Sequence, residues 1–138
     1  MGFRSFLHRI TAPSVSGEPP LEPCKMVCIV NHQLKMGKGK IAAQVGHGAV
    51  MATMKSGAEK PLHLEQWLAS GQKKVCLKGL DAEHLLTLEN QAKAAGVCTT
   101  LVHDAGHTQI PRGSLTVLAL GPDVETLLEE ITGDLKLL

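Results

Sequence analysis

Residues 25–40 read KMVCIVNHQLKMGKGK and decide the fold. The apolar run Met26–Val30 predicts a strand that is buried on both faces of a sheet, because it contains no polar residue to turn toward water. A loop rich in glycine and lysine follows at residues 35–39. The stretch after it predicts a helix of about five turns that runs to Lys55 and is ended by Gly57. A buried strand that leads into a long helix is typical of α/β proteins.

The same alternation of strand and helix continues to the end of the chain. Strands are expected over residues 74–80, 97–103 and 115–120, and helices over residues 61–69, 82–95 and 124–131. Asp81 and Asp123 stand where helix N-caps are expected, and Gly71 and Gly96 stand where helices end. The order predicts an α/β fold with one sheet and helices on both of its faces.

The composition fits one soluble domain without stable membrane insertion. The chain has 138 residues, of which 43% are apolar and 20% are charged, and its formal net charge is +1. No run approaches the roughly 20 apolar residues that a membrane helix needs. Phe3, Phe6 and Trp67 are the only Phe, Trp or Tyr residues. Their scarcity argues against a surface on which exposed rings stack on unpaired bases.

Residues 1–24 differ from the rest of the chain. Four of the seven prolines lie there and no periodicity is sustained, which predicts a flexible leader before a domain at residues 25–138. The first ten residues place apolar side chains at helical spacing beside two arginines, which resembles a weak organelle-targeting helix. We therefore expect a cytoplasmic protein, with mitochondrial association through the leader left open.

Cysteine and histidine spacing gives no sign of a metal site. Cys24, Cys28, Cys76 and Cys98 form no CxxC pair, and we expect buried thiols in a reducing compartment. The histidines show no HExxH or similar ligand spacing, so we expect no metal and no other cofactor. No serine lies in a GxSxG elbow, which argues against a serine hydrolase.

Positive charge is concentrated in the first half of the chain. Residues 1–58 carry seven lysines or arginines against two acids, net +5, while residues 59–138 carry seven against eleven, net −4. A partner that bears phosphates would meet the first half. The alternative is a solvated lysine face without a ligand.

Two loops follow the carboxyl ends of predicted strands, where open α/β sheets place their sites. Residues 31–40 join glycines and lysines to a helix start, which suits an anion, although an ordinary glycine-rich helix entry explains the pattern equally well. The loop is not a Walker motif, because Gly37 and Gly39 are too close together. Residues 104–114 begin with Asp104, a carboxylate that either orients water or forms only an Asx-type turn.

The helix after the first loop carries a polar stripe. Its members recur at spacings of four, three and four residues: Lys40, Gln44, His47 and Met51. The face expected against the sheet is small and apolar: Ile41, Val45, Gly48 and Ala52. Lys40 and Gln44 then point toward the two loops or are plain solvent contacts. His103 lies in a predicted strand and is expected to be a structural histidine.

Five motifs, taken in order over residues 25–138, resemble the type 2 peptidyl-tRNA hydrolases. They are KMGKGKxAAQxxH at 35–47, DAGxTQ at 104–109, SxTV at 114–117, GP at 121–122 and TGxLKL at 132–137. The resemblance implies a three-layer α/β/α sandwich with a four-stranded mixed sheet, whose last strand is antiparallel to the others. It also implies that water, without a metal, cleaves the ester between a peptide and the 3′ ribose of tRNA.

The resemblance also implies the site. The family's catalytic residues correspond to Lys40, Gln44, Asp104, Thr108 and Thr116. By residue type, Asp104 is expected to orient or activate water and Lys40 to stabilise the oxyanion, while the others hydrogen-bond the ester or the water. Contacts to the tRNA are expected from Lys35, Lys38, His47 and His107.

The chain departs from the family just before the lysine loop. Asn31-His32-Gln33-Leu34 stands where the family often has Arg-x-Asp-Leu, which removes a charged pair near the expected site. Arg112 and His107 also replace residues that are common in the family. The alternative to a hydrolase is therefore a catalytically weak module that binds tRNA or a protein partner. The family often dimerises, and a homodimer is left open because no sequence feature fixes it.

Overall fold

The computed structural model describes residues 16–106 and 110–138. Four strands form one mixed sheet in the order β2-β1-β4-β3. Their bounds are β1 Cys24–Asn31, β2 Lys74–Gly79, β3 Thr99–His103 and β4 Leu115–Val124. β1 and β2 are parallel, and β4 is antiparallel to both β1 and β3. The mixed sheet with a reversed last strand is confirmed.

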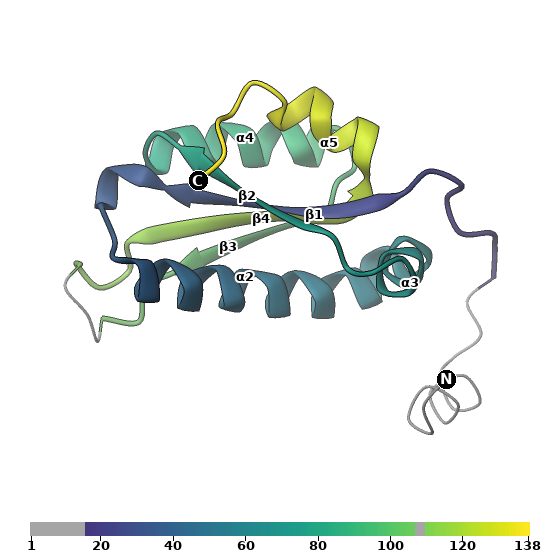
Figure 1. The fold of residues 1–138 in the computed structure, drawn as a ribbon, viewed down its shortest axis with the longest axis horizontal. Coiled ribbons are helices and arrows are strands. Elements are labelled where there is room, and N and C mark those ends of the chain that lie inside the picture. The colour runs from purple at the N-terminus through teal and green to yellow at the C-terminus, as the bar shows by residue number, and fades with distance from the viewer. Residues whose placement is uncertain (1–15, 107–109) are drawn as a thin grey trace.

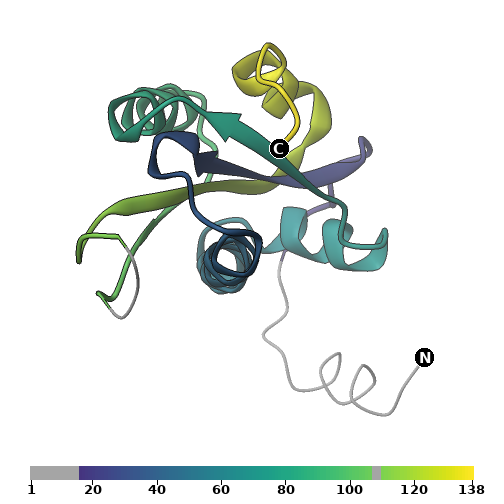
Figure 2. The ribbon, with the colours of Figure 1, turned by 60° about the vertical axis from the view of Figure 1, so that its left-hand side comes forward.

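Helices cover both faces of this sheet (Figure 1). One face carries α2 (Lys38–Glu59) and α3 (Pro61–Ala69), and the other carries α4 (Ala82–Ala94) and α5 (Glu125–Thr132). A short 3-10 turn, η1 (His32–Leu34), joins β1 to the lysine loop. Figure 2 shows the three layers nearly end on, with the sheet between the two helical layers. The predicted α/β/α sandwich is therefore confirmed.

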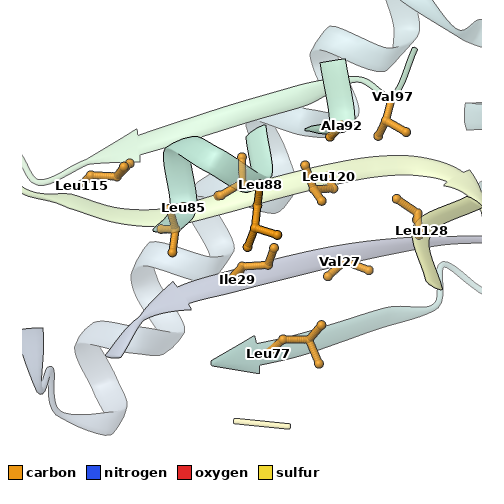
Figure 3. Packing of buried hydrophobic residues seen from close by; sticks show 11 residues of the cluster. Val27, Ile29, Leu77, Leu85, Leu88, Ala92, Val97, Leu115, Leu120 and Leu128 are labelled. Atoms are coloured by element: carbon orange, nitrogen blue, oxygen red, sulfur yellow. The ribbon is translucent and has the colours of Figure 1, made fainter. Parts of the chain in front are cut away.

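Each face of the sheet has its own apolar core, and β1 contributes to both. Val27 and Ile29 pack beneath α4 and α5 (Figure 3). Met26, Cys28 and Val30 alternate with them and belong to the core on the side of α2 and α3. The apolar run is buried on both faces, as predicted, because side chains along a strand point alternately to its two sides.

The sheet-facing side of α2 differs in part from the predicted face. Its buried residues follow a spacing of four: Gln44, Gly48, Ala52 and Ser56. Ile41 and Val45 are only half-buried at the border of the core. A Cβ added to Gly48 would lie 3.4 Å from side-chain atoms of Val102, Val117 and Ala119. The helix therefore lies close to the sheet, and this closeness brings Gln44 into the interior.

The predicted end of the long helix is wrong. Gly57 lies inside α2, which continues to Glu59. Pro61 begins α3, and Lys60 between the two helices has φ −140° and ψ 60°. A proline disfavours the helical conformation at the residue before it, so Pro61 ends α2 instead of Gly57.

The predicted boundary between the last strand and the last helix is also wrong. Gly121 and Pro122 lie inside β4, which continues to Val124 and pairs there with Cys24 of β1 after a shift in register. Asp123 does not cap α5. It is buried, and its Oδ2 lies 2.5 Å from Lys60 Nζ, so an ion pair replaces the expected cap.

The expected leader, residues 1–24, lies mostly outside the described residues. Cys24 is the first residue of β1, and Glu22 accepts a hydrogen bond of 2.6 Å from Thr126 Oγ1. Within residues 16–106 and 110–138, no helix has both the length and the apolar character to span a membrane.

Candidate active site

The two loops identified in the sequence lie at the same end of the sheet (Figure 1). β1 leads through η1 into the lysine loop and the start of α2, while β3 ends at His103 and Asp104 follows directly. The carboxyl ends of β1 and β3 lie at the same end of the sheet, because both strands run opposite to β4. The fold therefore brings together Lys40 and Asp104, which are 64 positions apart in the sequence.

A buried ion pair joins the two loops. Lys40 Nζ lies 2.5 Å from Asp104 Oδ1, and the two side chains are 14% and 3% exposed. Attraction between two charges that are shielded from water is stronger than on the surface, but each charge then depends on its partner. Loss of either residue would leave a poorly solvated charge.

The backbone of the second loop holds the Asp104 carboxylate in place. The Gly106 N–H donates to Asp104 Oδ2 at 3.0 Å, which is the Asx-type turn considered from the sequence. The backbone N–H of Asp104 donates to Ser114 O, and the Gly113 N–H donates to Asp104 O, both at 2.9 Å. The Asx turn and the functional interpretation are compatible, because the turn uses Oδ2 while Oδ1 faces Lys40.

Gln44 and Thr116 form a second polar pair. The Thr116 hydroxyl lies 2.6 Å from Gln44 Oε1 and 3.1 Å from Val102 O, both acceptors. Both residues are buried, so the polar stripe of α2 turns inward at Gln44 and does not meet solvent there. With its oxygen engaged by Thr116, Gln44 has its two amide N–H groups to offer to a ligand.

Lys40, Gln44 and Asp104 border a cavity of about 300 Å³, which we call the active-site hollow. It is lined by Lys40, Ala43, Gln44, His47, His103, Asp104 and Ala105. His103 is exposed, so the expectation of a structural histidine inside a strand is wrong. A shift in register between Val102 and His103 interrupts the pairing with β4, and such irregularities redirect a side chain.

The remaining predicted site residues are not all brought to this hollow. Thr116 does not line it and reaches it only through Gln44. Lys38 is exposed in the first turn of α2, and Lys35 lies beside a different, larger hollow. Thr108 and His107 lie in residues 107–109, outside the described residues.

The altered residues before the lysine loop lie beside the active-site hollow and not in it. Asn31 is buried, and its Nδ2 donates to Leu115 O at 2.9 Å. Its Oδ1 has no hydrogen-bond partner among the described residues. His32 and Gln33 line the larger hollow. The ion pair between Lys40 and Asp104 and the hydrogen bond between Gln44 and Thr116 are therefore both present with Asn31, His32 and Gln33 at these positions.

The thiols are protonated core groups. Burial raises the pKa of Cys28 to about 12, and burial together with the nearby Asp123 carboxylate raises that of Cys24 to about 11. Cys98 is also buried, while Cys76 is half-buried, so the expectation of buried thiols is confirmed for three of the four.

In the part of the chain that the structure describes, no three His, Cys, Asp or Glu side chains are grouped to hold a metal ion.

Comparisons with known proteins identify related chains. The family model for "Peptidyl-tRNA hydrolase PTH2" matches residues 24–138. A peptidyl-tRNA hydrolase of Thermococcus onnurineus is 45% identical over 113 residues, which cover 82% of this chain and 96% of the relative. A peptidyl-tRNA hydrolase of Methanocaldococcus jannaschii is 40% identical over 114 residues, 83% of this chain and 99% of the relative. The human protein named "Peptidyl-tRNA hydrolase 2, mitochondrial" is 47% identical over 113 residues, 82% of this chain and 63% of the relative.

Proposed function

The chain belongs to the peptidyl-tRNA hydrolase PTH2 family, and we propose that it cleaves peptidyl-tRNA in the active-site hollow through Lys40 and Asp104. The hydrolase activity follows from the family, and the alternative of a catalytically weak binding module is not favoured. The observation that supports this position for the site is the buried ion pair between Lys40 and Asp104 at the rim of a cavity.

Asp104 acts on the attacking water. Its carboxylate is fixed by the Gly106 N–H and by Lys40, so it can accept a proton from a water that lies over the ester carbonyl. The water oxygen bonds to the carbonyl carbon while its proton moves to Asp104. The bond from that carbon to the ribose 3′ oxygen then breaks, and the proton passes to the 3′ oxygen. The products are a tRNA with its 3′ hydroxyl and a peptide carboxylic acid, which releases its remaining proton to water and leaves as the carboxylate.

Lys40 stabilises the charge that develops on the carbonyl oxygen. An ammonium group has three N–H donors, so it can keep one on Asp104 and direct another toward the oxyanion. The Gln44 amide, held by Thr116, positions the ester or the water from the floor of the hollow. Thr108 is proposed as a further hydrogen-bond partner on the strength of the family motif.

The proposed reaction needs neither a metal nor another cofactor. A carboxylate takes the proton, an ammonium group stabilises the oxyanion, and an amide orients the reacting groups, which covers the requirements of ester hydrolysis. The tRNA body is proposed to contact Lys35, Lys38, His47 and His107. Of the described residues in this set, the two lysines are exposed at the same end of the sheet, and His47 lines the active-site hollow.

Two expectations extend the proposal to assembly and location. Three exposed apolar side chains of α2 and α3 line one surface depression, on which a second copy of the chain can pack: Val50, Met54 and Leu68. Residues 1–24 can direct the chain to mitochondria, the location that the human relative's name gives for that protein. Sedimentation of the purified chain and imaging of a fluorescent fusion to residues 1–24 test the two expectations.

Substitution of the ion pair tests the site. We expect Asp104→Asn and Lys40→Met each to lower the single-turnover rate by on the order of a hundredfold or more, because each removes charge that is needed in the transition state. The Kd for tRNA should stay unchanged. Lys93→Met, at an exposed lysine in the last turn of α4, is the control for loss of one positive charge. A wild-type rate in either site variant, with a melting curve that shows a folded protein, would refute the assignment.

A further inference from the structure

A second cavity, of about 630 Å³, lies at the same end of the sheet as the active-site hollow. Its wall comes from η1, the end of β2, the first turn of α4 and the C-terminal segment, and it includes His32, Lys35, Lys78, Leu80, His84 and Lys136. We call it the lysine hollow. The catalytic steps described above use none of these side chains.

The C-terminal segment places two of these lysines opposite each other. Leu137 forms an antiparallel bridge with Leu77 of β2, and the Lys78 N–H donates to Lys136 O at 2.9 Å. Lys78 and Lys136 therefore occupy facing positions on neighbouring strands. Like charges in such positions repel each other. Both side chains are exposed, and neither has an ion-pair partner among residues 16–106 and 110–138, so an anion bound between them would relieve the repulsion.

Lys35 adds a third positive charge from a fixed backbone position. It follows η1 with φ +48°, and its N–H donates to His32 O at 3.1 Å. η1 is itself held beside β2, because the Gln33 N–H donates to Leu80 O at 3.2 Å. Among the described residues of the wall, Asp134 is the only acid, so the wall has three lysines and one carboxylate. Positive charge is therefore concentrated in the lysine hollow, at the end of β2.

We propose that the lysine hollow binds phosphates in the body of the substrate tRNA. The tRNA is then held at two places, by its ester in the active-site hollow and by these phosphates in the lysine hollow. This inference rests on the proposed function. The Cα atoms of Lys35 and Lys40 are at most about 18 Å apart, because the two residues are five positions apart in the chain. A single tRNA arm can therefore reach both hollows. Lysines on phosphates carry no sequence information, which suits an enzyme whose substrates differ in sequence.

The test removes the two facing charges and compares a matched pair. Lys78→Gln/Lys136→Gln is the test variant. Lys74→Gln/Lys93→Gln, which removes exposed lysines at the start of β2 and in the last turn of α4, is the control. The Kd for tRNA is measured across a series of salt concentrations. Cleavage is measured on an N-acetylaminoacyl-tRNA and on the same N-acetylaminoacyl ester of a CCA trinucleotide, which lacks the body of the tRNA.

We expect the test variant to bind tRNA with a weaker dependence on salt. Loss of two phosphate contacts should reduce the slope of log K against log salt by about 1.4 to 1.8. The KM for the tRNA substrate should rise, while cleavage of the trinucleotide ester stays as in the wild type. The control variant should keep the wild-type slope.

The possible failures can be distinguished. A test variant with the wild-type slope would overturn the inference, even if the wild type cleaves both substrates and the proposed function stands. Slower cleavage of the trinucleotide ester by the folded test variant would also overturn it, because the lysines would then act on the active-site hollow. The substitutions could change the slope as expected while the wild type cleaves neither substrate. That result would contradict the proposed function and leave the tRNA site supported.

Discussion

Thr116 is a completely buried hydroxyl whose partners are Gln44 Oε1 and Val102 O. Thr116→Val keeps the shape of the side chain but leaves the Gln44 oxygen without its donor. We expect the free energy of unfolding to fall by about 1–3 kcal/mol, the usual cost of an unsatisfied buried polar group. The hydrolysis rate should fall as well, because Gln44 loses the contact that fixes it. Urea unfolding and single-turnover kinetics measure the two effects.

Thr116→Ser is the matched control, because it keeps the hydroxyl and removes only a methyl group. It should retain most of the wild-type rate. If Thr116→Val hydrolysed the substrate as fast as Thr116→Ser, the proposed positioning of Gln44 through this hydroxyl would be wrong.

At the scale of single residues, the sequence indicated which residues belong to the candidate site better than it indicated which side chains they contact. Lys40 and Asp104 were singled out by residue type and motif, but their ion pair depends on the arrangement of α2 beside β3. Gln44 was expected on a polar stripe, and its burial follows from the close approach that Gly48 permits. Lys78 was not identified, because a lysine at the end of a strand shows no motif until the C-terminal segment is placed beside it.

At the scale of elements, α2 sets the geometry of the active-site hollow, and Gly48 sets the distance of α2 from the sheet. Gly48→Leu would force a side chain against Val102, Val117 and Ala119, which a Cβ alone already approaches to 3.4 Å. Overpacking of this kind typically costs about 1–3 kcal/mol. Displacement of α2 should also slow hydrolysis, because Lys40 and Gln44 lie on the same helix.

Gly46→Leu provides the control on the same helix. Among the described residues, no atom lies within 4 Å of a Cβ added at Gly46, so leucine should be tolerated there and should favour the helix. Thermal melting and hydrolysis assays on both variants give the comparison. Equal stability and activity of Gly48→Leu and Gly46→Leu would contradict the close packing described for α2.

The elements themselves were largely predictable, because apolar periodicity and helix caps are local signals. Asp81 caps α4 as expected, and its Oδ1 accepts a hydrogen bond of 2.8 Å from the His84 N–H. One error lies where tertiary contacts override such signals. Gly121 did not end β4, because continued pairing with β1 extends that strand to Val124. The error at Gly57 is of another kind, because the local effect of Pro61 ends α2 two residues later.

At the scale of the whole molecule, the active-site hollow and the lysine hollow lie at one end of the sheet, so the two can serve one large substrate. The uneven charge along the sequence indicated a phosphate-bearing partner for residues 1–58. Lys78 and Lys136 belong to the acidic second half and were hidden in its net charge. Only the fold shows that these lysines and Lys35 line the same cavity.

Alkaline pH should destabilise the molecule through its buried thiols. Burial raises the pKa of Cys28 from 9.0 to about 12. Between these values the unfolded thiol ionises while the folded one keeps its proton, so the free energy of unfolding falls as the pH rises. Below pH 9 this contribution is complete. Urea unfolding as a function of pH should show a smaller fall in Cys28→Val than in the wild type, and equal falls would contradict the effect of burial.

Asp104 is proposed to drive hydrolysis of the ester of peptidyl-tRNA by this chain without a metal. The most direct measurement is hydrolysis of an N-acetylaminoacyl-tRNA by the purified chain in the presence of EDTA, with folded Asp104→Asn assayed beside it. We predict release of the N-acetylamino acid by the wild type and a rate lower by on the order of a hundredfold or more in the variant. No release by a wild type that binds tRNA, or equal release by both proteins, would contradict the claim.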